Sequence, residues 1–336
     1  MKFIVDAFGG DNAPLEILKG CAQAVEQLGV EILLTGRAGT ILDVAQKEGI
    51  SLEHMEIADA PDVMDMNSAG TEIVKHGKNT SMAVGLQKLA DGAGDAFISA
   101  GNSGALTVGA TFLVKRIKGV KRIAFAPIMP SADGCFMLID GGANVDCKPE
   151  MLAQFGMMGS IYMQKVMGVS NPRVGLLNVG TEEHKGGELQ HGAYALLKES
   201  PLHFIGNVEA RDVPDNAVDV LVADGFSGNV FLKTYEGVAM MVIQKFKGVL
   251  TSSLKNKLAA AMVLKDVKAL KKTMDYNEYG GAPLLGCTKP VFKAHGSAKA
   301  KTFFNALRLT KGYVEGNVAG EIADSVAAYQ AQEATE

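Results

Sequence analysis

The sequence predicts an α/β fold, namely a three-layer α/β/α sandwich built around a mostly parallel sheet. Apolar segments typical of strands alternate with helical segments along most of the 336 residues, which is the pattern of repeated β–α units. Most strand segments are continuous apolar runs, and such runs are typical of parallel strands that helices cover on both faces.

The predicted elements follow one another in a regular order. Pro14 stands where a first helical turn tolerates proline, just after Asp11 and Asn12 as a capping pair. The turn 131–134 separates two apolar runs and predicts a hairpin, so part of the sheet is expected to be antiparallel. The expected strands are 2–6, 31–35, 55–59, 95–99, 122–128, 135–140, 173–178, 202–206 and 218–223. The expected helices are 14–28, 39–48, 81–91, 103–116, 149–167, 187–199, 230–250, 254–273 and 298–330.

A single domain is expected over residues 1–336, with a helical excursion at about 245–275. Between residues 245 and 272 there are eight lysines and one acid, in a chain whose net charge is −4. An apolar stripe at helical spacing runs through the same segment and contains Leu250, Leu254, Leu258 and Met262. Two interpretations stay open. The excursion is either a hairpin that packs on the body or on a second subunit, or a basic amphipathic element that lies on an anionic membrane surface.

The composition excludes several classes of protein. The chain has no Trp, 6% aromatic residues and an acidic net charge, so nucleic-acid binding is not expected. Its apolar stretches are too short to cross a bilayer, and the first strand meets Asp6 too early for a secretory signal. The four cysteines are widely spaced and form no C-x-x-C pair, so they are expected to be reduced thiols of a cytoplasmic protein.

Four of the expected strands end in glycine, asparagine and small hydroxyl residues. Backbone N–H groups and short polar side chains at the carboxyl edge of a parallel sheet bind anions, because glycine lets the backbone approach closely. We therefore expect the four segments to form one anion site. They are Ile4–Asp11, Phe97–Gly104, Leu176–Thr181 and Leu221–Asn229.

Several common catalytic motifs are absent from the sequence. There is no G-x-x-x-x-G-K-[ST] loop, no G-x-G-x-x-G after the first strand and no H-E-x-x-H, and the six histidines lack metal-ligand spacing. Residues 225–229 depart from G-x-S-x-G, because the second glycine follows the serine directly. No metal, no cofactor and no serine hydrolase are therefore expected. Hydroxyls, amides and lysines suit a substrate that supplies its own nucleophile, as inorganic phosphate does when it attacks a thioester.

Seven motifs together resemble the bacterial acyl-carrier-protein:phosphate acyltransferases of phospholipid synthesis. They are Asp6–Asp11, Ile98–Ala105, Leu177–Glu182, Ile205–Asp212, Asp224–Val230, Tyr279–Ala282 and Lys293–Ser297. The resemblance extends in register from residue 2 to about residue 325. Two positions depart from the family, since Phe8 stands where methionine is usual and Ser227 where threonine is common.

This resemblance implies an enzyme that transfers a long-chain fatty acyl group from acyl carrier protein to inorganic phosphate, giving acyl phosphate for phosphatidic acid synthesis. It implies the fold shared by phosphate acetyltransferases and isopropylmalate dehydrogenases, in a cytoplasmic homodimer. It further implies peripheral association with the inner face of the cell membrane, where a membrane glycerol-3-phosphate acyltransferase receives the acyl phosphate.

The resemblance also divides the predicted site into groups. The thioester carbonyl and the phosphopantetheine end are assigned to Asn178, Lys185, Asp224 and Asn229, with Lys185 or Asn229 facing the developing oxyanion. Phosphate is assigned to Ser99, Gly101, Asn102, Ser103 and Gly104, with His76 or Lys78 supplying charge. The other strand-end residues of the site are Asp6, Gly9, Gly10, Asp11, Gly180, Gly225, Ser227 and Gly228. Membrane contact is assigned to Leu254, Leu258 and Met262.

Two basic stretches are alternative docking surfaces for the carrier protein. Carrier proteins are acidic as a class and need a basic partner surface, which residues 115–122 or the lysines of 245–272 can supply.

Two other functions compete with acyl transfer. A metal- and NAD-dependent decarboxylating dehydrogenase needs a cluster of aspartates on one helix, which the sequence lacks. A non-catalytic scaffold that recruits carrier protein to the membrane has no need for polar groups at so many strand ends.

Overall fold

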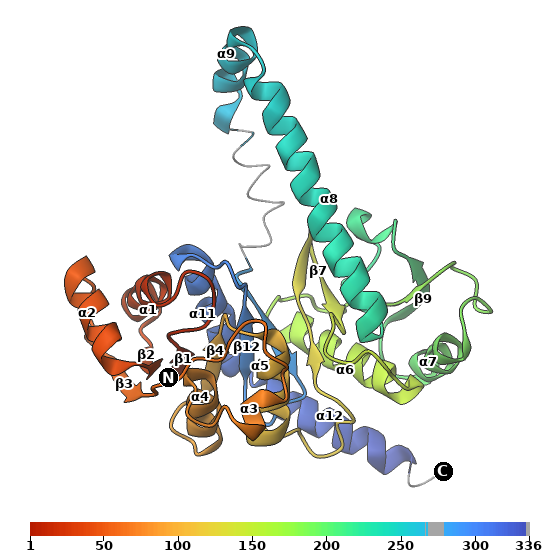
Figure 1. Cartoon of the computed structure of the whole chain (residues 1–336). Helices are drawn as coiled ribbons and strands as arrows, with labels where there is room; N and C mark the ends of the chain where they lie inside the picture. Colours follow the sequence, from red (N-terminus) through yellow and green to blue (C-terminus); the bar gives the residue numbers. More distant parts are fainter. Residues whose placement is uncertain (266, 268–278, 334–336) are drawn as a thin grey trace.

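The computed structural model describes residues 1–265, 267 and 279–333, and its strands form two sheets that lie side by side (Figure 1). The first sheet has seven strands and the second has five. Seven strand pairings are parallel and three are antiparallel. The predicted α/β class with mostly parallel pairing is confirmed, although the strands are divided between two sheets instead of one.

The first sheet runs in the order β3-β2-β1-β4-β12-β11-β5. Its strands are β1 (Lys2–Asp6), β2 (Glu31–Gly36), β3 (Met55–Asp59), β4 (Ala96–Ser99), β5 (Ala124–Phe125), β11 (Gly281–Leu285) and β12 (Val291–Ala294). Helices cover both faces. Phe3 and Val5 of β1 belong to one buried cluster with α1 (Leu15–Leu28) and α11 (Ala300–Glu315), whereas Ile4 points to the other face and α4 (Ser81–Ala90).

The second sheet runs in the order β6-β7-β10-β8-β9. Its strands are β6 (Ile128–Ser131), β7 (Gly134–Ile139), β8 (Val174–Asn178), β9 (Phe204–Glu209) and β10 (Val220–Val222). β6 and β7 pair antiparallel, so the predicted hairpin is confirmed. Helices α6 (Pro149–Lys165) and α7 (Glu188–Glu199) cover one face, and α8 (Gly225–Thr251) packs Leu232 against the other.

Several expectations differ from the observed elements. The expected strand 122–128 is divided between β5, in the first sheet, and β6, in the second, and the expected helix 103–116 ends as an α-helix at Gly109. Strands β11 and β12 were not expected, because β11 contains glycine and proline and β12 has only four residues. The expected helix 298–330 is two helices, α11 and α12 (Val318–Glu333), because Asn317 between them adopts a positive φ of 47°. The expected helix 254–273 is observed as α9 (Leu254–Met262), and most of its remainder lies outside the described residues. The other helical elements are α2 (Ala38–Glu48), α3 (Glu72–Lys75), α5 (Ser103–Gly109) with a π-helical turn at Ala110–Val114, and a 3-10 turn at Val213–Asp215.

Helices α8 and α9 form an arm that projects far beyond the two sheets (Figure 1). α8 begins earlier than expected because the Asp224 carboxylate caps it, accepting from the N–H groups of Phe226 at 3.0 Å and Ser227 at 2.9 Å. Its buried residues all lie within its first turns, so the outer part of the helix stands away from the body. Among the described residues, the length and apolarity needed to cross a membrane are found in no helix.

The buried carboxylate of Asp140, which follows β7, joins the two sheets. Its Oδ1 accepts from the N–H of Phe125 in β5 at 2.9 Å and from those of Gly142 and Ala143 at 3.1 and 3.0 Å. Its Oδ2 accepts from the backbone and side-chain N–H groups of Asn144 at 2.7 and 2.8 Å. Burial raises the pKa of this carboxyl, and these donors oppose the shift. One side chain therefore fixes a strand of each sheet and the loop 141–144.

Asp140→Ala is expected to lower the free energy of unfolding by about 3 kcal/mol or more, because buried N–H groups would lose their acceptor. Asp140→Asn is expected to lose less, since its amide oxygen still accepts. Urea unfolding of both variants measures the difference. A loss below about 1 kcal/mol for the alanine variant would contradict this role.

Candidate functional site

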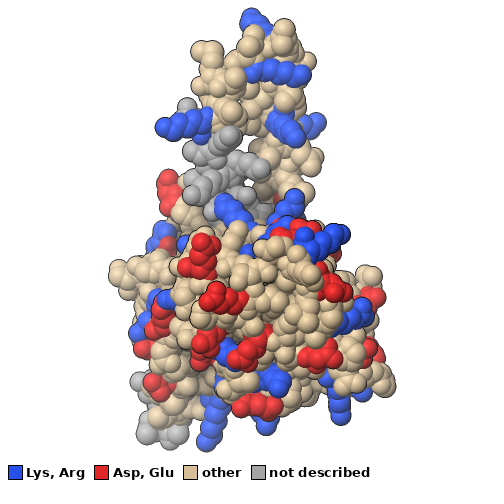
Figure 2. Space-filling model, turned by 90° about the vertical axis from the view of Figure 1, so that its left-hand side faces the viewer, with Lys and Arg blue, Asp and Glu red and all other residues tan. Residues whose placement is uncertain are grey.

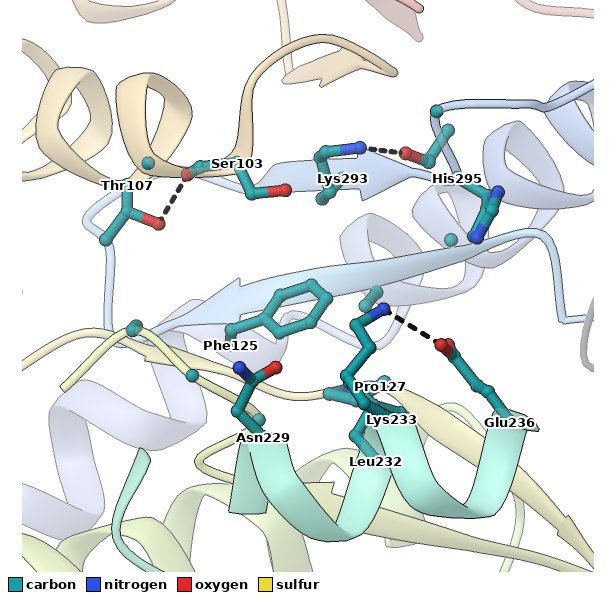
Figure 3. Close-up of a pocket in the computed structure, with 18 of the residues that line it drawn as sticks. Ser103, Thr107, Phe125, Pro127, Asn229, Leu232, Lys233, Glu236, Lys293 and His295 are labelled. Carbon is teal, nitrogen blue, oxygen red and sulfur yellow. Dashed lines mark hydrogen bonds and ion pairs between the residues drawn. The ribbon is translucent and has the colours of Figure 1, made fainter. Parts of the chain in front are cut away.

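A cavity of about 650 Å³ lies between the two sheets, within the usual size range of small-molecule sites (Figure 3). One wall comes from α5 and the end of β12, and the facing wall comes from α8, with Phe125 of β5 between them. Seven of the lining residues are glycines, so the backbone comes close to any ligand. The cavity thus lies where the carboxyl ends of β4 and β12 face the start of α8.

Lys293 is the most buried cation of the cavity, with 8% of its surface exposed. Its Nζ donates to the carbonyl oxygens of Ala100, at 3.2 Å, and of Ala294. Burial lowers its pKa to about 8 together with the charge of Lys233, while the carboxylates of Asp6 and Asp11 oppose the shift. Lys293 is therefore still charged at neutral pH, as a fixed cation at the edge of the first sheet.

His295 lies two residues further along the same wall. Its Nδ1 accepts from the backbone N–H of Ser297 at 3.3 Å and lies 2.8 Å from the Ser297 hydroxyl oxygen. Burial lowers the pKa of His295, and Lys293 lowers it further. The ring is therefore neutral near pH 7 and, since Nδ1 accepts, carries its proton on Nε2.

The facing wall is one side of α8. Asn229, Leu232, Lys233 and Glu236 follow each other at helical spacing and all line the cavity. The Lys233 Nζ forms an ion pair with the Glu236 Oε2 at 2.8 Å. Glu236 is the one carboxylate among the described lining residues, and it is paired with Lys233, so the cation without an ion-pair partner among the described residues is Lys293 on the opposite wall.

Among the residues assigned to phosphate from the sequence, Ser103 and Gly104 line the cavity. Ser99 is fully buried, and its hydroxyl donates to Asp6 at 2.6 Å and accepts from the N–H of Gly101 at 3.0 Å. This pair of contacts holds the turn that follows β4, behind the cavity wall.

Asn102 holds a neighbouring loop. Its Oδ1 accepts from the N–H of Ala105 at 2.9 Å and caps α5, while its Nδ2 donates to the carbonyls of residues 65, 66 and 68. His76 and Lys78 are exposed beyond the C-terminal end of α3 and are not among the lining residues. The structure thus brings only part of the predicted phosphate group together.

The end of β1 supports the site from behind. The N–H of Asp11 donates to the carbonyl of Gly296 at 2.8 Å, next to His295. A side chain at Gly9 would collide with Asp6 and Ser99, and one at Gly10 with the carbonyl of Gly296. These glycines therefore let the first loop pack directly against the loops that carry the cavity wall.

The segment after β8 stands apart from the cavity. The Nδ2 of Asn178 donates to the carbonyl of Lys185 at 3.0 Å, and the Lys185 Nζ lies 3.9 Å from Glu182. Asn178, Gly180 and Lys185 are not among the lining residues. At the start of α8, Asn229 lines the cavity, whereas Asp224, Gly225, Ser227 and Gly228 form the cap and the first turn.

Sequence reasoning gave no role to the cationic residues of the cavity. Lys293 and His295 stand in a motif that carried the family resemblance, but their strand was not expected. Lys233 and Glu236 lie four and seven residues after Asn229, so the helical period alone places them on its face.

The described residues hold no group of three or more histidine, cysteine, aspartate or glutamate side chains arranged as a metal site. All four cysteines are free, and none of them lines the cavity. Burial raises the pKa of Cys147 to about 11 and that of Cys287 to about 12, so these thiols are not nucleophilic near neutral pH.

Solved phosphotransacetylases share this fold. The enzyme from Streptococcus pyogenes matches with a TM-score of 0.63 and 15% identity, over 94% of each chain. The EutD phosphotransacetylase from Staphylococcus aureus matches with a TM-score of 0.61 and 17% identity, also over 94% of each chain. The fold and the cavity together define the class of protein. It is an α/β protein with two sheets and, between them, a cavity that has a lysine on each wall.

The particular family follows from sequence similarity. Residues 1–321 match the family described as "Fatty acid synthesis protein". A phosphate acyltransferase of Geobacillus thermodenitrificans is 48% identical over 324 residues, which are 96% of this chain and 98% of that protein. One of Acetivibrio thermocellus is 47% identical over 316 residues, 94% of this chain and 93% of that protein. The chain belongs to this phosphate acyltransferase family, so the resemblance seen in its motifs is confirmed.

Ser99→Ala is expected to lower the free energy of unfolding by about 1–2 kcal/mol, because the buried Asp6 loses a donor and Gly101 an acceptor. Thermal unfolding measures the loss. Titration of phosphate provides the opposing test, since weaker phosphate binding without any loss of stability would place the Ser99 hydroxyl on the ligand.

Proposed function

We propose that this chain transfers a long-chain fatty acyl group from acyl carrier protein to inorganic phosphate. An oxygen of HPO₄²⁻ forms a bond to the thioester carbonyl carbon, and the carbon–sulfur bond breaks with its electron pair passing to sulfur. The proton of the phosphate ends on the released thiol. The products are acyl phosphate, a precursor of phosphatidic acid, and free acyl carrier protein, and no cofactor takes part.

The observation that supports this proposal most strongly is a cavity with cations on both walls, in a chain whose relatives are phosphate acyltransferases. Lys293 and Lys233 attract an anionic nucleophile, while Phe125, Pro127 and Leu232 offer an apolar surface for the acyl end of the thioester. No thiol lines the cavity, so the site supplies positioning and charge while phosphate supplies the nucleophile.

Purified protein with palmitoyl acyl carrier protein and inorganic phosphate tests this function. The expected products are free carrier thiol and acyl phosphate, which hydroxylamine converts to a hydroxamate. Omission of phosphate must stop the release of both. Thiol release at the same rate without phosphate would show a thioesterase, and the proposal would then be wrong.

Asn229→Ala is expected to lower kcat/KM for the acyl carrier protein at least about tenfold, the effect of losing a donor to a developing oxyanion. Asn229 lines the cavity, whereas Lys185, given the same assignment from sequence, lies outside the lining. Lys185→Ala is therefore expected to lose less. Initial rates of both variants decide: unchanged turnover removes Asn229 from the site, and equal losses support the assignment of Lys185.

The arm is included in the proposal as the membrane-binding element. Leu254, Leu258 and Met262 are 77%, 64% and 87% exposed. Figure 2 shows lysine and arginine side chains on the arm, whereas many acidic side chains occupy the face of the body below it. Exposed apolar side chains among lysines suit the anionic inner face of the cell membrane. There the cytoplasmic protein would pass acyl phosphate to a glycerol-3-phosphate acyltransferase.

Leu258→Glu is expected to release the protein from vesicles of anionic phospholipid while turnover of soluble substrate is largely kept, because Leu258 lies outside the cavity. Leu42→Glu is the matched control, since Leu42 is an exposed leucine of α2 on the body. Sedimentation with vesicles measures both. If the Leu258 variant sediments like the control, the arm is not the membrane contact.

A homodimer is part of the same proposal. Val230, Val238 and Val242 lie on α8 and are 53%, 50% and 47% exposed, an apolar surface that suits a second copy of the chain. Light scattering of the purified protein measures the mass in solution, and a monomer at all concentrations would contradict a dimer.

The carrier protein is proposed to dock on the arm side. Gly281 at the start of β11 lines the cavity, whereas Gly286, beyond its other end, accepts from the N–H of Ile117 at 3.0 Å. The strand between them spans about 13 Å, so residues 115–122 lie away from the cavity. The arm instead continues the helix that lines it, and its lysines complement an acidic partner.

A further inference from the structure

Two lysines lie on opposite walls of the cavity (Figure 3). Lys293 lies at the end of β12 in the first sheet, and Lys233 belongs to α8, which covers the second. We propose that these two lysines bind inorganic phosphate between them, so that one cation from the first sheet and one from α8 hold the nucleophile. The inference rests on the proposed function, and it places the phosphate charge partners away from His76 and Lys78.

Lys293 is the fixed half of this pair. An ammonium group has three N–H donors, and the carbonyls of Ala100 and Ala294 take two of them. Within the described ranges no carboxylate forms an ion pair with Lys293, so one donor and the positive charge are left for a ligand. The carbonyl of Ala100 is itself held in place, because the preceding Ser99 is hydrogen-bonded to Asp6.

Lys233 is the adjustable half. Its side chain is 63% exposed, and its one described ion pair, with Glu236, lies within the same helix. Lys233 and Lys293 line the same cavity, and the positive charge of Lys233 is among the causes that lower the pKa of Lys293, so the two ammonium groups repel each other. An anion between them offsets this repulsion, and Lys293 is its main charge partner because Glu236 already pairs with Lys233.

The neighbouring side chains fit a thioester beside this phosphate. Asn229 precedes Lys233 by one helical turn on the same face of α8. A thioester carbonyl that accepts from Asn229 therefore lies next to a phosphate held by Lys233. Ser103 on the facing wall adds an uncharged donor near Lys293 (Figure 3).

Calorimetric titration with inorganic phosphate alone tests the pair without any acyl substrate. Lys293→Met is expected to weaken phosphate binding about tenfold or more, and Lys233→Met several-fold, since each removes a charge-assisted contact. Lys88→Met, at an exposed position of α4, is the matched control and is expected to bind like the unaltered protein. Normal phosphate binding by the folded Lys293→Met variant would overturn the inference.

The pH dependence of the KM for phosphate distinguishes a role of the Lys293 charge from a role of Lys293 packing alone. Since the pKa of Lys293 is about 8, the KM for phosphate is expected to rise as the pH passes above that value and the lysine loses its proton. Lys293→Arg keeps its charge and is expected to bind phosphate with little change up to pH 9.5 or so. A KM that rises equally in this variant and in the unaltered protein would also overturn the inference.

The two proposals fail in distinguishable ways. Phosphate binding that depends on both lysines, without acyl transfer from any carrier protein, would refute the proposed function and leave the phosphate site intact. Acyl transfer to phosphate with an unaltered phosphate KM in the Lys293→Met variant would refute the phosphate site and leave the proposed function intact.

Discussion

The buried carboxylate of Asp140 is the interaction on which the rest of the structure depends. It accepts from the N–H of Phe125 in the first sheet and from loop 141–144 beyond the second, so one anion fixes how the sheets meet. The carbonyl of Asn144 then accepts from the N–H of Gly225, where α8 begins. A side chain at Gly228 would collide with the carbonyl oxygen of Asp140, so α8 can approach only because a glycine stands there. The position of the whole facing wall of the cavity follows from this contact.

The strand ends predicted as one anion site have divided roles in the structure. The end of β1 contributes no lining residue, but Asp6 and Asp11 favour the charged form of Lys293 and thereby oppose the cost of burying it. The end of β4 contributes Ser103 and Gly104, and the start of α8 contributes Asn229. The end of β8 forms its own closed loop through Asn178. Charge at the cavity comes instead from β12 and from the middle of a helix.

The sequence was sufficient for features that depend on local pattern. Continuous apolar runs predicted β1, β2 and β4, and glycine-rich ends predicted Ser103, Gly104 and Asn229, which do line the cavity. It was not sufficient for features that arise from tertiary contact. β12 is a strand because β4 and β11 pair with it on either side, and its four residues carry too weak a period to show this alone. The role of Asp140 in joining the two sheets could not be predicted from the sequence, since its donors come from a segment 15 residues away and from a loop of irregular shape.

Two lysines on opposite walls of one cavity repel each other when no ligand is bound, and this repulsion lowers stability. Neighbouring carboxylates reduce the loss. Glu236 neutralises part of the charge of Lys233 from within the same helix. The carboxylates of Asp6 and Asp11, at the end of β1, favour the charged form of Lys293. Neither compensation fills the space between the two lysines. An anion that enters this space gains from both, while a neutral ligand leaves the repulsion in place. Because Lys293 belongs to the first sheet and Lys233 to the helix that covers the second, the same contact that fixes the sheets, at Asp140, also sets the separation of the charges. The proposed selectivity for a small dianion is therefore a property of the fold as a whole and not of either wall alone.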